Sequence, residues 1–401
     1  MTAIPAAQPI PWPRIIGLSV SQLVAWGVLY YAFAVIVEPM GAETGWTKPQ
    51  IHGAQSLGLL VSGLSAYTVG RHIDRAGGRG VMLMGALLGA VAVVLWSQVT
   101  SLWQLYVVSV LIGVASAMAL YEAAFAVAAR LAPGNYRRAI TVITLLGGFA
   151  STAFIPLTHW LVGQLGWRDA LLVLALIEVA VCAAIPLVML GENADSRVQV
   201  KSGVRPSVFR LVRRQPVFWL LLVSYVCFAF FYTSLLFNLL PLLGAYGMSA
   251  AAAVGLYALI GPSQVTGRLG MFAIDRFIPT GAAGVFATAL PVLAMLVLVS
   301  VSPMSTWFLA FPILFGAGMG IKTIVQATAA PEFLRIQEYG ALQGLLAMPA
   351  QIVQAASPFF AALLWQWSGG YEALEFVLLA TATVSALSFG LAAWLSRHRG
   401  F

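Results

Sequence analysis

Long apolar segments recur along the whole chain and are separated by short stretches that contain charged or turn-forming residues. A helix needs about 20 apolar residues to cross a hydrocarbon core of about 30 Å. The alternation of apolar and polar residues that is typical of membrane β-barrel strands is absent. We therefore predict an all-α integral membrane protein with twelve transmembrane helices, at approximately Arg14 to Val37, Ile51 to Gly70, Val81 to Gln98, Leu102 to Ala129, Ala139 to Leu165, Ala170 to Leu190, Val217 to Leu243, Ala250 to Ile274, Thr280 to Val301, Ser305 to Ala330, Tyr339 to Trp367 and Tyr371 to Leu395.

The composition supports a membrane protein and excludes several soluble classes. Hydrophobic residues make up 61% of the 401 residues and charged residues only 8%, whereas soluble proteins have about 25% charged residues. The two cysteines, Cys182 and Cys227, lie in apolar segments and form no metal-binding or disulfide pattern. We expect no metal, no cofactor and, despite the net charge of +8, no nucleic-acid partner.

The positions of the basic residues predict how the chain is oriented in the membrane. Short cytoplasmic loops collect Lys and Arg. With the N-terminus inside, seventeen of the 21 basic residues become cytoplasmic, and only Lys48 and Arg168 lie outside. Arg268 and Lys322 fall inside predicted helices. We therefore expect a multi-pass protein of the cell (inner) membrane with both termini in the cytoplasm.

The longest polar stretch, Gly191 to Pro216, divides the chain into two parts of similar length. We predict an N-terminal half of six helices at 1–190, a cytoplasmic basic linker at 191–216 and a C-terminal half of six helices at 217–401. In each half, the loop after the second helix has a Gly followed by Asp-Arg: Gly70 with Asp74-Arg75, and Gly270 with Asp275-Arg276. This weak repeat is what a duplicated six-helix unit predicts.

The first of these loops carries a family signature. From Gly70 it reads Gly-Arg-His-Ile-Asp-Arg-Ala-Gly-Gly-Arg, which resembles the Gly-x-x-x-Asp-Arg-x-Gly-Arg-Arg loop of the major facilitator superfamily and departs from it at Gly78. The resemblance implies the major facilitator fold and a gating role for Gly70, Asp74, Arg75 and Arg79, in which the Asp pairs with Arg residues on the cytoplasmic side in one state and releases them in another. The alternative is that these charges only set the topology.

The eighth predicted helix points to one branch of that superfamily. Its Gly267-Arg268 pair is similar to the oxalate/formate antiporter and monocarboxylate transporter relatives, in which this arginine contacts the substrate carboxylate. Trp26-Gly27 and Tyr30-Tyr31 in the first helix are similar to the same branch. Those antiporters also have a lysine in the eleventh helix, which this chain lacks, so the role of that lysine does not transfer to Lys322 in the tenth.

Four charged residues within the predicted helices need an explanation, because each costs about 2.5–3.5 kcal/mol at mid-bilayer. They are Glu122, Glu178, Arg268 and Lys322. Glu122, Arg268 and Lys322 lie at a similar depth, about 6–9 Å past the midpoints of their helices towards the cytoplasm. We predict that Arg268 and Lys322 bind an anionic substrate, with a structural ion pair as the alternative for each.

Further residues are candidates for the same cavity. Gln264 shares a helix face with Arg268 because the two are four residues apart. Tyr30, Tyr31 and Tyr121 are predicted to line the cavity, although most aromatic clusters in such a chain are packing. Small residues are expected to allow close helix approach, among them Gly113, Gly316, Gly318 and Gly320.

Glu122 is the predicted site of proton coupling, since a carboxylate in a helix without other charges is less costly to bury when protonated. The alternative is a permanent counter-ion for Arg268 or Lys322. Roles for Glu178 and for His159, near the outer end of the fifth helix, stay open.

Taken together, these features predict a secondary active transporter that moves a small organic anion, similar to a monocarboxylate, by proton coupling or exchange through alternating access. The alternative within the same fold is efflux of a drug, metalloid or other toxic solute. An integral-membrane enzyme is disfavoured because the chain has no HExxH motif, no catalytic triad context and no nucleotide-binding loop. We expect the transporter to be a monomer.

Overall fold

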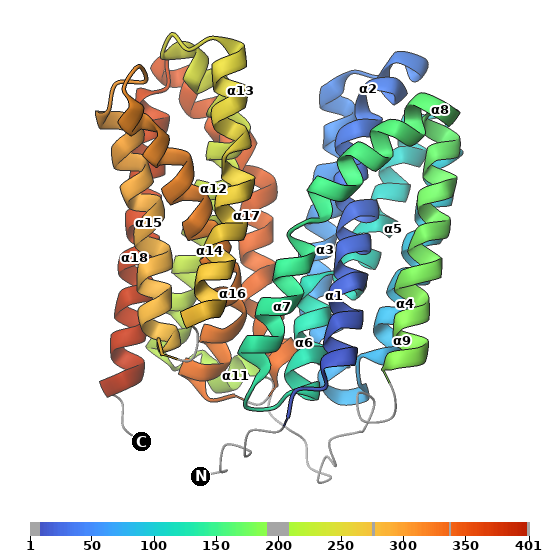
Figure 1. Ribbon diagram of the computed structural model, residues 1–401, viewed down its shortest axis with the longest axis horizontal. Helices are drawn as coiled ribbons and strands as arrows, with labels where there is room; N and C mark the ends of the chain where they lie inside the picture. Colours follow the sequence, from blue (N-terminus) through green and yellow to red (C-terminus); the bar gives the residue numbers. More distant parts are fainter. Residues whose placement is uncertain (1–8, 191–207, 275–276, 337, 399–401) are drawn as a thin grey trace. The chain divides into compact units, whose positions relative to one another are not determined.

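The computed structural model describes residues 9–190, 208–274, 277–336 and 338–398, and over these residues the chain forms helices and no strand (Figure 1). The contacts divide the chain into two compact units. The first unit is Met1–Arg205 with Glu338–Met348, and the second is Pro206–Gln337 with Pro349–Phe401. This division differs from a simple split at the linker. The eleven residues Glu338–Met348, at the start of a helix late in the chain, pack with the N-terminal part.

Two helices of the first unit begin with residues that favour a helix start. Thr47 with Gln50, and Ser101 with Gln104, form capping boxes that satisfy free backbone N–H groups. The elements are α1 (Trp12–Trp26), η1 (Gly27–Tyr31), α2 (Ala32–Thr44), α3 (Lys48–Ala76), α4 (Arg79–Ser97), α5 (Leu102–Ala119), α6 (Tyr121–Leu131), α7 (Tyr136–Gly147), α8 (Ala150–Glu178), η2 (Val179–Ala183) and α9 (Ala184–Met189).

Three of these helical stretches are interrupted. The α5 and α6 helices are separated by Leu120, whose backbone is extended (φ −83°, ψ −165°), and the carbonyl of Ala119 accepts a hydrogen bond from Gln22 Nε2 at 2.7 Å. Within α8, Gly166 has φ +81° and ψ +165°, so the chain turns back there (Figure 1). The η1 and η2 elements are π-helical turns, which often mark functional sites inside helices.

The second unit contains the remaining helices. They are α11 (Val208–Val212), α12 (Pro216–Ala245), α13 (Ala250–Ala258), α14 (Ile260–Ile274), α15 (Thr280–Ser300), η3 (Thr306–Leu309), α16 (Ala310–Leu334), α17 (Tyr339–Ser368) and α18 (Glu372–His398). The α17 helix starts in the first unit, and its part from Pro349 onward belongs to the second.

Each of the twelve predicted transmembrane segments is helical in the structure. Nine helical stretches of the described residues are long and apolar enough to cross a membrane, and one of these, Tyr136–Met189, contains two predicted segments on either side of Gly166. The helix α3 and the pair α13 and α14 supply the other two. Part of the predicted linker, 191–207, and the Asp275-Arg276 pair lie outside the described residues; the described end of the linker contains the short helix α11.

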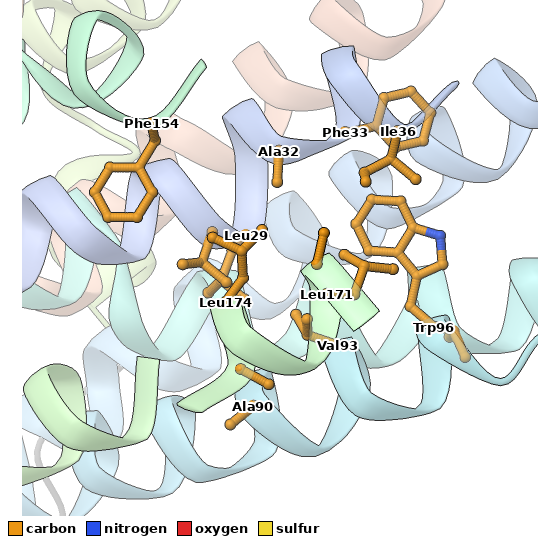
Figure 2. Close-up of a cluster of buried hydrophobic side chains, with 14 of the residues drawn as sticks. Leu29, Ala32, Phe33, Ile36, Ala90, Val93, Trp96, Phe154, Leu171 and Leu174 are labelled. Carbon is orange, nitrogen blue, oxygen red and sulfur yellow. The ribbon is translucent and has the colours of Figure 1, made fainter. Parts of the chain in front are cut away.

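Each unit has its own apolar interior. In the first, Leu29, Ala32, Phe33 and Ile36 from the first transmembrane segment meet side chains of α4 and α8, as Figure 2 shows. In the second, leucines pack with a group of phenylalanines, namely Phe228, Phe231, Phe308, Phe311 and Phe315. Because lipid is as apolar as these interiors, close packing holds such helices together more than transfer out of water does.

Glycines provide that close packing, as predicted. A Cβ added to Gly113 would lie 2.2 Å from the carbonyl oxygen of Gly58, and one added to Gly320 would lie 2.1 Å from that of Gln264. The prediction that Gly113, Gly316, Gly318 and Gly320 permit close helix approach is therefore confirmed.

Candidate functional site

Two basic side chains are buried in the second unit, where sequence reasoning expected substrate contacts. Arg268 on α14 is 6% exposed and Lys322 on α16 is 5% exposed. Within the described residues neither forms an ion pair with a carboxylate. Two buried cations in one unit therefore rely on other groups for their stabilisation.

Lys322 is stabilised by one amide oxygen and two aromatic faces. Its Nζ donates to Gln326 Oε1 at 2.8 Å and lies 3.5 Å from the ring centre of Phe228 and 5.4 Å from that of Tyr225. Tyr225 in turn donates its hydroxyl to the backbone carbonyl of Gln326 at 3.0 Å. A desolvated ammonium gains about 2 kcal/mol from such a ring, which offsets part of the cost of burying this amine.

Arg268 lies where the backbones of α14 and α16 come close together. The neighbouring Gly267 brings α14 so close to α16 that a Cβ there would lie 2.6 Å from the carbonyl oxygen of Ala317. The buried Nε of Arg268 makes no hydrogen bond within the described residues. A guanidinium with an unused buried donor is suited to a carboxylate, which it binds through two parallel hydrogen bonds.

The structure brings some of the predicted second-unit residues together and separates others. Gln264, partly buried, lies one helical turn from Arg268 and packs against Gly316 and Gly320 of α16. Lys322 follows Gly320 by two residues and lies against α12 instead. Gln264 and Arg268 thus lie on the same helix, α14. Lys322 lies on the face of α16 that packs against α12, and not on the face that packs against α14.

The predicted tyrosines of the first unit form one aromatic cluster, whose centre is Trp26. Its ring centre lies 5.2 Å from Tyr30, 6.3 Å from Tyr31 and 5.0 Å from Tyr121. Two of these tyrosines lie in the η1 turn, and Tyr121 begins α6 directly after the break at Leu120. Irregular backbone therefore presents all three rings; their role in binding stays a prediction.

Glu122 lies in the first turn of α6 and is partly buried. A carboxylate is favoured there, because the N-terminal end of a helix carries partial positive charge. Glu122 belongs to the first unit, whereas Arg268 and Lys322 belong to the second. His159 is exposed on α8, and Glu178, at the end of the same helix, is fully buried.

Asp74, the predicted gating residue, binds backbone and not an arginine side chain. Its Oδ1 accepts from the N–H of Gly340 at 2.9 Å and its Oδ2 from the N–H of Ala341 at 2.7 Å. Asp74 therefore caps the start of α17 inside the first unit, where free N–H groups and the helix dipole attract a carboxylate. Arg75, the next residue, is exposed; pairing of Asp74 with arginine side chains in another state stays a prediction.

Burial makes the charge on Asp74 costly, although it lies beyond the predicted end of its transmembrane segment at Gly70. Burial raises the pKa of Asp74 to about 6, and the two backbone N–H groups counteract this only in part. The nearby charge of Glu338 raises the pKa further, and that of Arg130 lowers it. The capping bonds are consequently sensitive to pH in the weakly acidic range.

Glycines make this contact possible. A Cβ on Gly70 would lie 2.1 Å from the carbonyl oxygen of Gly340, and one on Gly344 would lie 2.5 Å from the Cα of Tyr67. The backbones of α3 and of the start of α17 therefore touch. Gly70 is required here for its lack of a side chain.

Two arginines support the same end of the first unit. Arg79 Nη2 donates to the carbonyl of Leu187 at 3.1 Å. Arg130 Nη1 donates to the carbonyls of Ile73 and Asp74 at 3.2 and 2.9 Å. In the sequence, Arg130 was only one of the seventeen basic residues that set the orientation, and Gly340 had no predicted role. No local sequence pattern connects either residue with Asp74.

A second polar cluster in the first unit joins the end of α2, the end of α4 and the part of α8 that follows Gly166. Glu43 accepts from Trp167 Nε1 at 2.6 Å and from Arg168 Nε at 3.0 Å. Arg168 also donates to the carbonyls of Ser97 and Val99 at 2.6 and 3.0 Å. These hydrogen bonds hold the pKa of Glu43 below its usual range, with the bond from Trp167 as the largest cause.

Comparison with known proteins defines the class to which this chain belongs. The chain matches the family model of the Major Facilitator Superfamily over residues 18–334. The chain belongs to this superfamily of membrane transporters.

A more specific similarity is to monocarboxylate transporter 13 of Rattus norvegicus, with 27% identity over 161 residues. That match covers 40% of this chain and 36% of the relative, so the chain matches about a third of that protein's length.

Solved structures share the fold. The E. coli fucose:proton symporter FucP matches with a TM-score of 0.71 and 15% identity, over 98% of this chain and 99% of that chain. The human organic anion transporter MFSD10 (TETRAN) matches with a TM-score of 0.69 and 18% identity, over 96% of this chain and 100% of that chain. The chain therefore has the twelve-helix major facilitator fold.

Proposed function

We propose that this secondary transporter moves a small organic anion, similar to a monocarboxylate, by proton coupling or exchange. The observation that carries the proposal is the burial of Arg268 and Lys322 in the second unit without a carboxylate partner among the described residues. An anionic substrate would supply the missing charge. The partial similarity to monocarboxylate transporter 13 supports the same substrate class.

Arg268 is the proposed main ligand for the carboxylate, with Lys322 and Gln264 as further polar contacts. Tyr30, Tyr31 and Tyr121 are further proposed substrate contacts. A guanidinium binds a carboxylate through a planar fork that an ammonium cannot reproduce.

The test is counterflow in proteoliposomes with a panel of labelled monocarboxylates, dicarboxylates and cationic drugs. The wild-type protein should exchange a monocarboxylate without chemical change, and Arg268→Lys should weaken that exchange by about tenfold, since a hydrogen bond to a charged group is worth roughly 1.5–3 kcal/mol. Arg214→Lys, at an exposed arginine, is the matched control. Exchange of cationic drugs alone would replace this proposal with drug efflux.

Glu122 is the proposed site of proton coupling, because its partly buried carboxyl lies beside the helix break that presents Tyr121. Glu122→Gln resembles the protonated form and should keep substrate exchange while losing accumulation driven by a pH gradient. Normal gradient-driven accumulation in this variant would instead indicate a fixed counter-ion.

For gating, we propose that the Asp74 cap on α17 closes in one transport state and opens in another, assisted by Gly70, Arg75 and Arg79. We also propose that the protein is a monomer in the cell membrane and that both of its termini are cytoplasmic. Single cysteines at Ser202 and Ser249 should react with impermeant reagents from opposite sides of the membrane, and labelling from the same side would contradict this topology.

A further inference from the structure

Glu178 lies in the interior of the first unit, at the last residue of α8 and directly before the π-helical turn η2. Its side chain is 0% exposed. Residues one turn away on the same helix face, Leu174, Ala175, Cys182 and Ala183, all belong to the apolar interior of the unit, and Figure 2 shows Leu174 within that cluster. The carboxyl is thus surrounded by apolar packing.

Neither carboxyl oxygen of Glu178 makes a hydrogen bond within the described residues. Its polar neighbour is Cys182, whose thiol interacts with the carboxyl but donates to the backbone carbonyl of Ser21 at 3.4 Å. One weak neighbour does not replace the hydrogen bonds that an ionised carboxylate has in water.

The basic groups of the surrounding elements are engaged elsewhere. On α4, Arg79 bonds to Leu187, nine residues and about 13 Å along the helix from Glu178. On α8, Arg168 lies ten residues before Glu178, about 15 Å away, and binds Glu43. On α1, the only basic residue is Arg14, seven residues and about 10 Å before Ser21.

The other titratable groups on these elements do not supply a positive charge either. On α8 they are Asp169 and the exposed His159. On α2 they are Glu38 and Glu43, which are paired with Lys48 and Arg168, and in η1 they are Tyr30 and Tyr31. The η2 and α9 elements contribute only Cys182.

We propose that Glu178 is a proton-binding site in the apolar interior of the first unit, occupied in the packed arrangement seen here. A carboxylate without a cation or hydrogen-bond donors is far more costly in such surroundings than a neutral carboxylic acid. Binding transfers a proton from hydronium to a carboxyl oxygen and releases one water molecule. The reverse step requires water or a cation at the carboxylate, so loss of the proton requires the packing of α1 and α4 against η2 to loosen.

This site is separate from Glu122 and goes beyond the proposed substrate chemistry. The adjacent π-helical turn is a place where the helix already departs from regular hydrogen bonding, and such turns are frequent at functional sites. A proton at Glu178 would therefore link the local packing of the first unit to pH, whatever the substrate.

The test is infrared spectroscopy of the purified full chain in detergent at pH 7, which resolves the carbonyl stretch of a protonated carboxylic acid from that of a carboxylate. The wild-type protein should have an acid band that shifts in deuterated buffer. The band should disappear in Glu178→Gln and persist in Glu122→Gln and Asp74→Asn. A wild-type protein without the band, or an unchanged band in Glu178→Gln, would overturn the proposal.

A second variant covers the case in which Glu178→Gln does not fold. Cys182→Ala removes the polar neighbour of the carboxyl, and the acid band should then move in frequency while keeping its intensity. A band that stays in place in Cys182→Ala would show that it comes from another residue, which would also overturn the proposal.

Discussion

The two compact units use charged side chains in different places and for different bonds. In the first unit, Asp74, Arg130 and Arg168 lie at helix ends and bond to backbone N–H or carbonyl groups. In the second unit, Arg268 and Lys322 lie within long helices, and Lys322 bonds to a side-chain amide and to aromatic faces. The first arrangement links helices to one another, whereas the second buries basic side chains without a carboxylate partner among the described residues.

This comparison predicts its largest effect at Lys322. Lys322→Met keeps most of the volume and removes the charge, so anion exchange should fall by about tenfold or more, since a hydrogen bond to a charged group is worth roughly 1.5–3 kcal/mol. Counterflow rates in proteoliposomes measure this. Lys48→Met, at an exposed ion pair with Glu38, should have little effect; equal losses in both variants would contradict a ligand role for the second unit's charge.

The next effect concerns the packing that holds the second unit's cations in place. A Cβ on Gly320 would lie 2.1 Å from the carbonyl oxygen of Gln264, so Gly320→Ala should destabilise the protein by about 1–3 kcal/mol through overpacking. Thermal unfolding in detergent measures the loss. Gly270→Ala is the control, because nothing lies within 4 Å of a Cβ there; a similar loss in the control would mean that α14 and α16 do not need their close approach.

In the first unit, the Asp74 cap should respond to pH. The packed state raises the pKa of Asp74 to about 6, above the value of about 3.9 in the unfolded chain. Stability from this group is therefore complete below about pH 4 and declines as the pH rises towards about 6. Relative to Asp74→Asn, the wild-type protein should lose about 1 kcal/mol across this window, after allowance for solvent screening.

Melting temperatures at pH 4, 5, 6 and 7 are the measurement for Asp74. The difference between the wild-type protein and Asp74→Asn should change up to about pH 6 and then level off. A difference that does not depend on pH would remove Asp74 from any pH response.

The smallest effect is expected at Glu43. Its pKa is lowered by hydrogen bonds from Trp167 and Arg168, so its contribution is present above the pKa of the unfolded chain and disappears as the pH falls through the lower folded value. Because Glu43 is exposed, Glu43→Gln should lower the melting temperature only slightly at pH 7, and the two proteins should converge at strongly acidic pH. A larger change in melting temperature for Glu43→Gln than for Asp74→Asn would contradict this order of the two stability contributions.

The sequence predicted the helices well and their interruptions poorly. All twelve predicted apolar segments are helical among the described residues, because length and hydropathy are local properties. The break at Leu120 occurs in an apolar run without an adjacent proline or glycine. The π-helical turn at Gly27–Tyr31 begins at a glycine, and the one at Val179–Ala183 lies just before Pro186, which cannot donate a backbone hydrogen bond to Cys182. These residues mark where a helix can be interrupted, but the form of the interruption depends on packing, which the order of residues does not reveal.

The candidate site was predicted by residue type and not by partner. Burial of Arg268 and Lys322 followed from their place in apolar segments. The rings that stabilise Lys322 come from Tyr225 and Phe228, nearly a hundred residues earlier, and Asp74 bonds to backbone 266 residues later. Neither contact has a periodic pattern, and backbone donors leave no trace in the sequence.

The turn at Gly166 has a consequence for experiments that insert or cleave the chain. Gly166 alone reverses the chain, and the next residues are fixed: Trp167 is 4% exposed, and Arg168 donates to two backbone carbonyls. Insertion is tolerated where backbone is exposed and free of such bonds. An epitope tag inserted after Gly166 should therefore disrupt folding, and a protease should not cut there, whereas the exposed turn near Gly247 is the better position for a reporter.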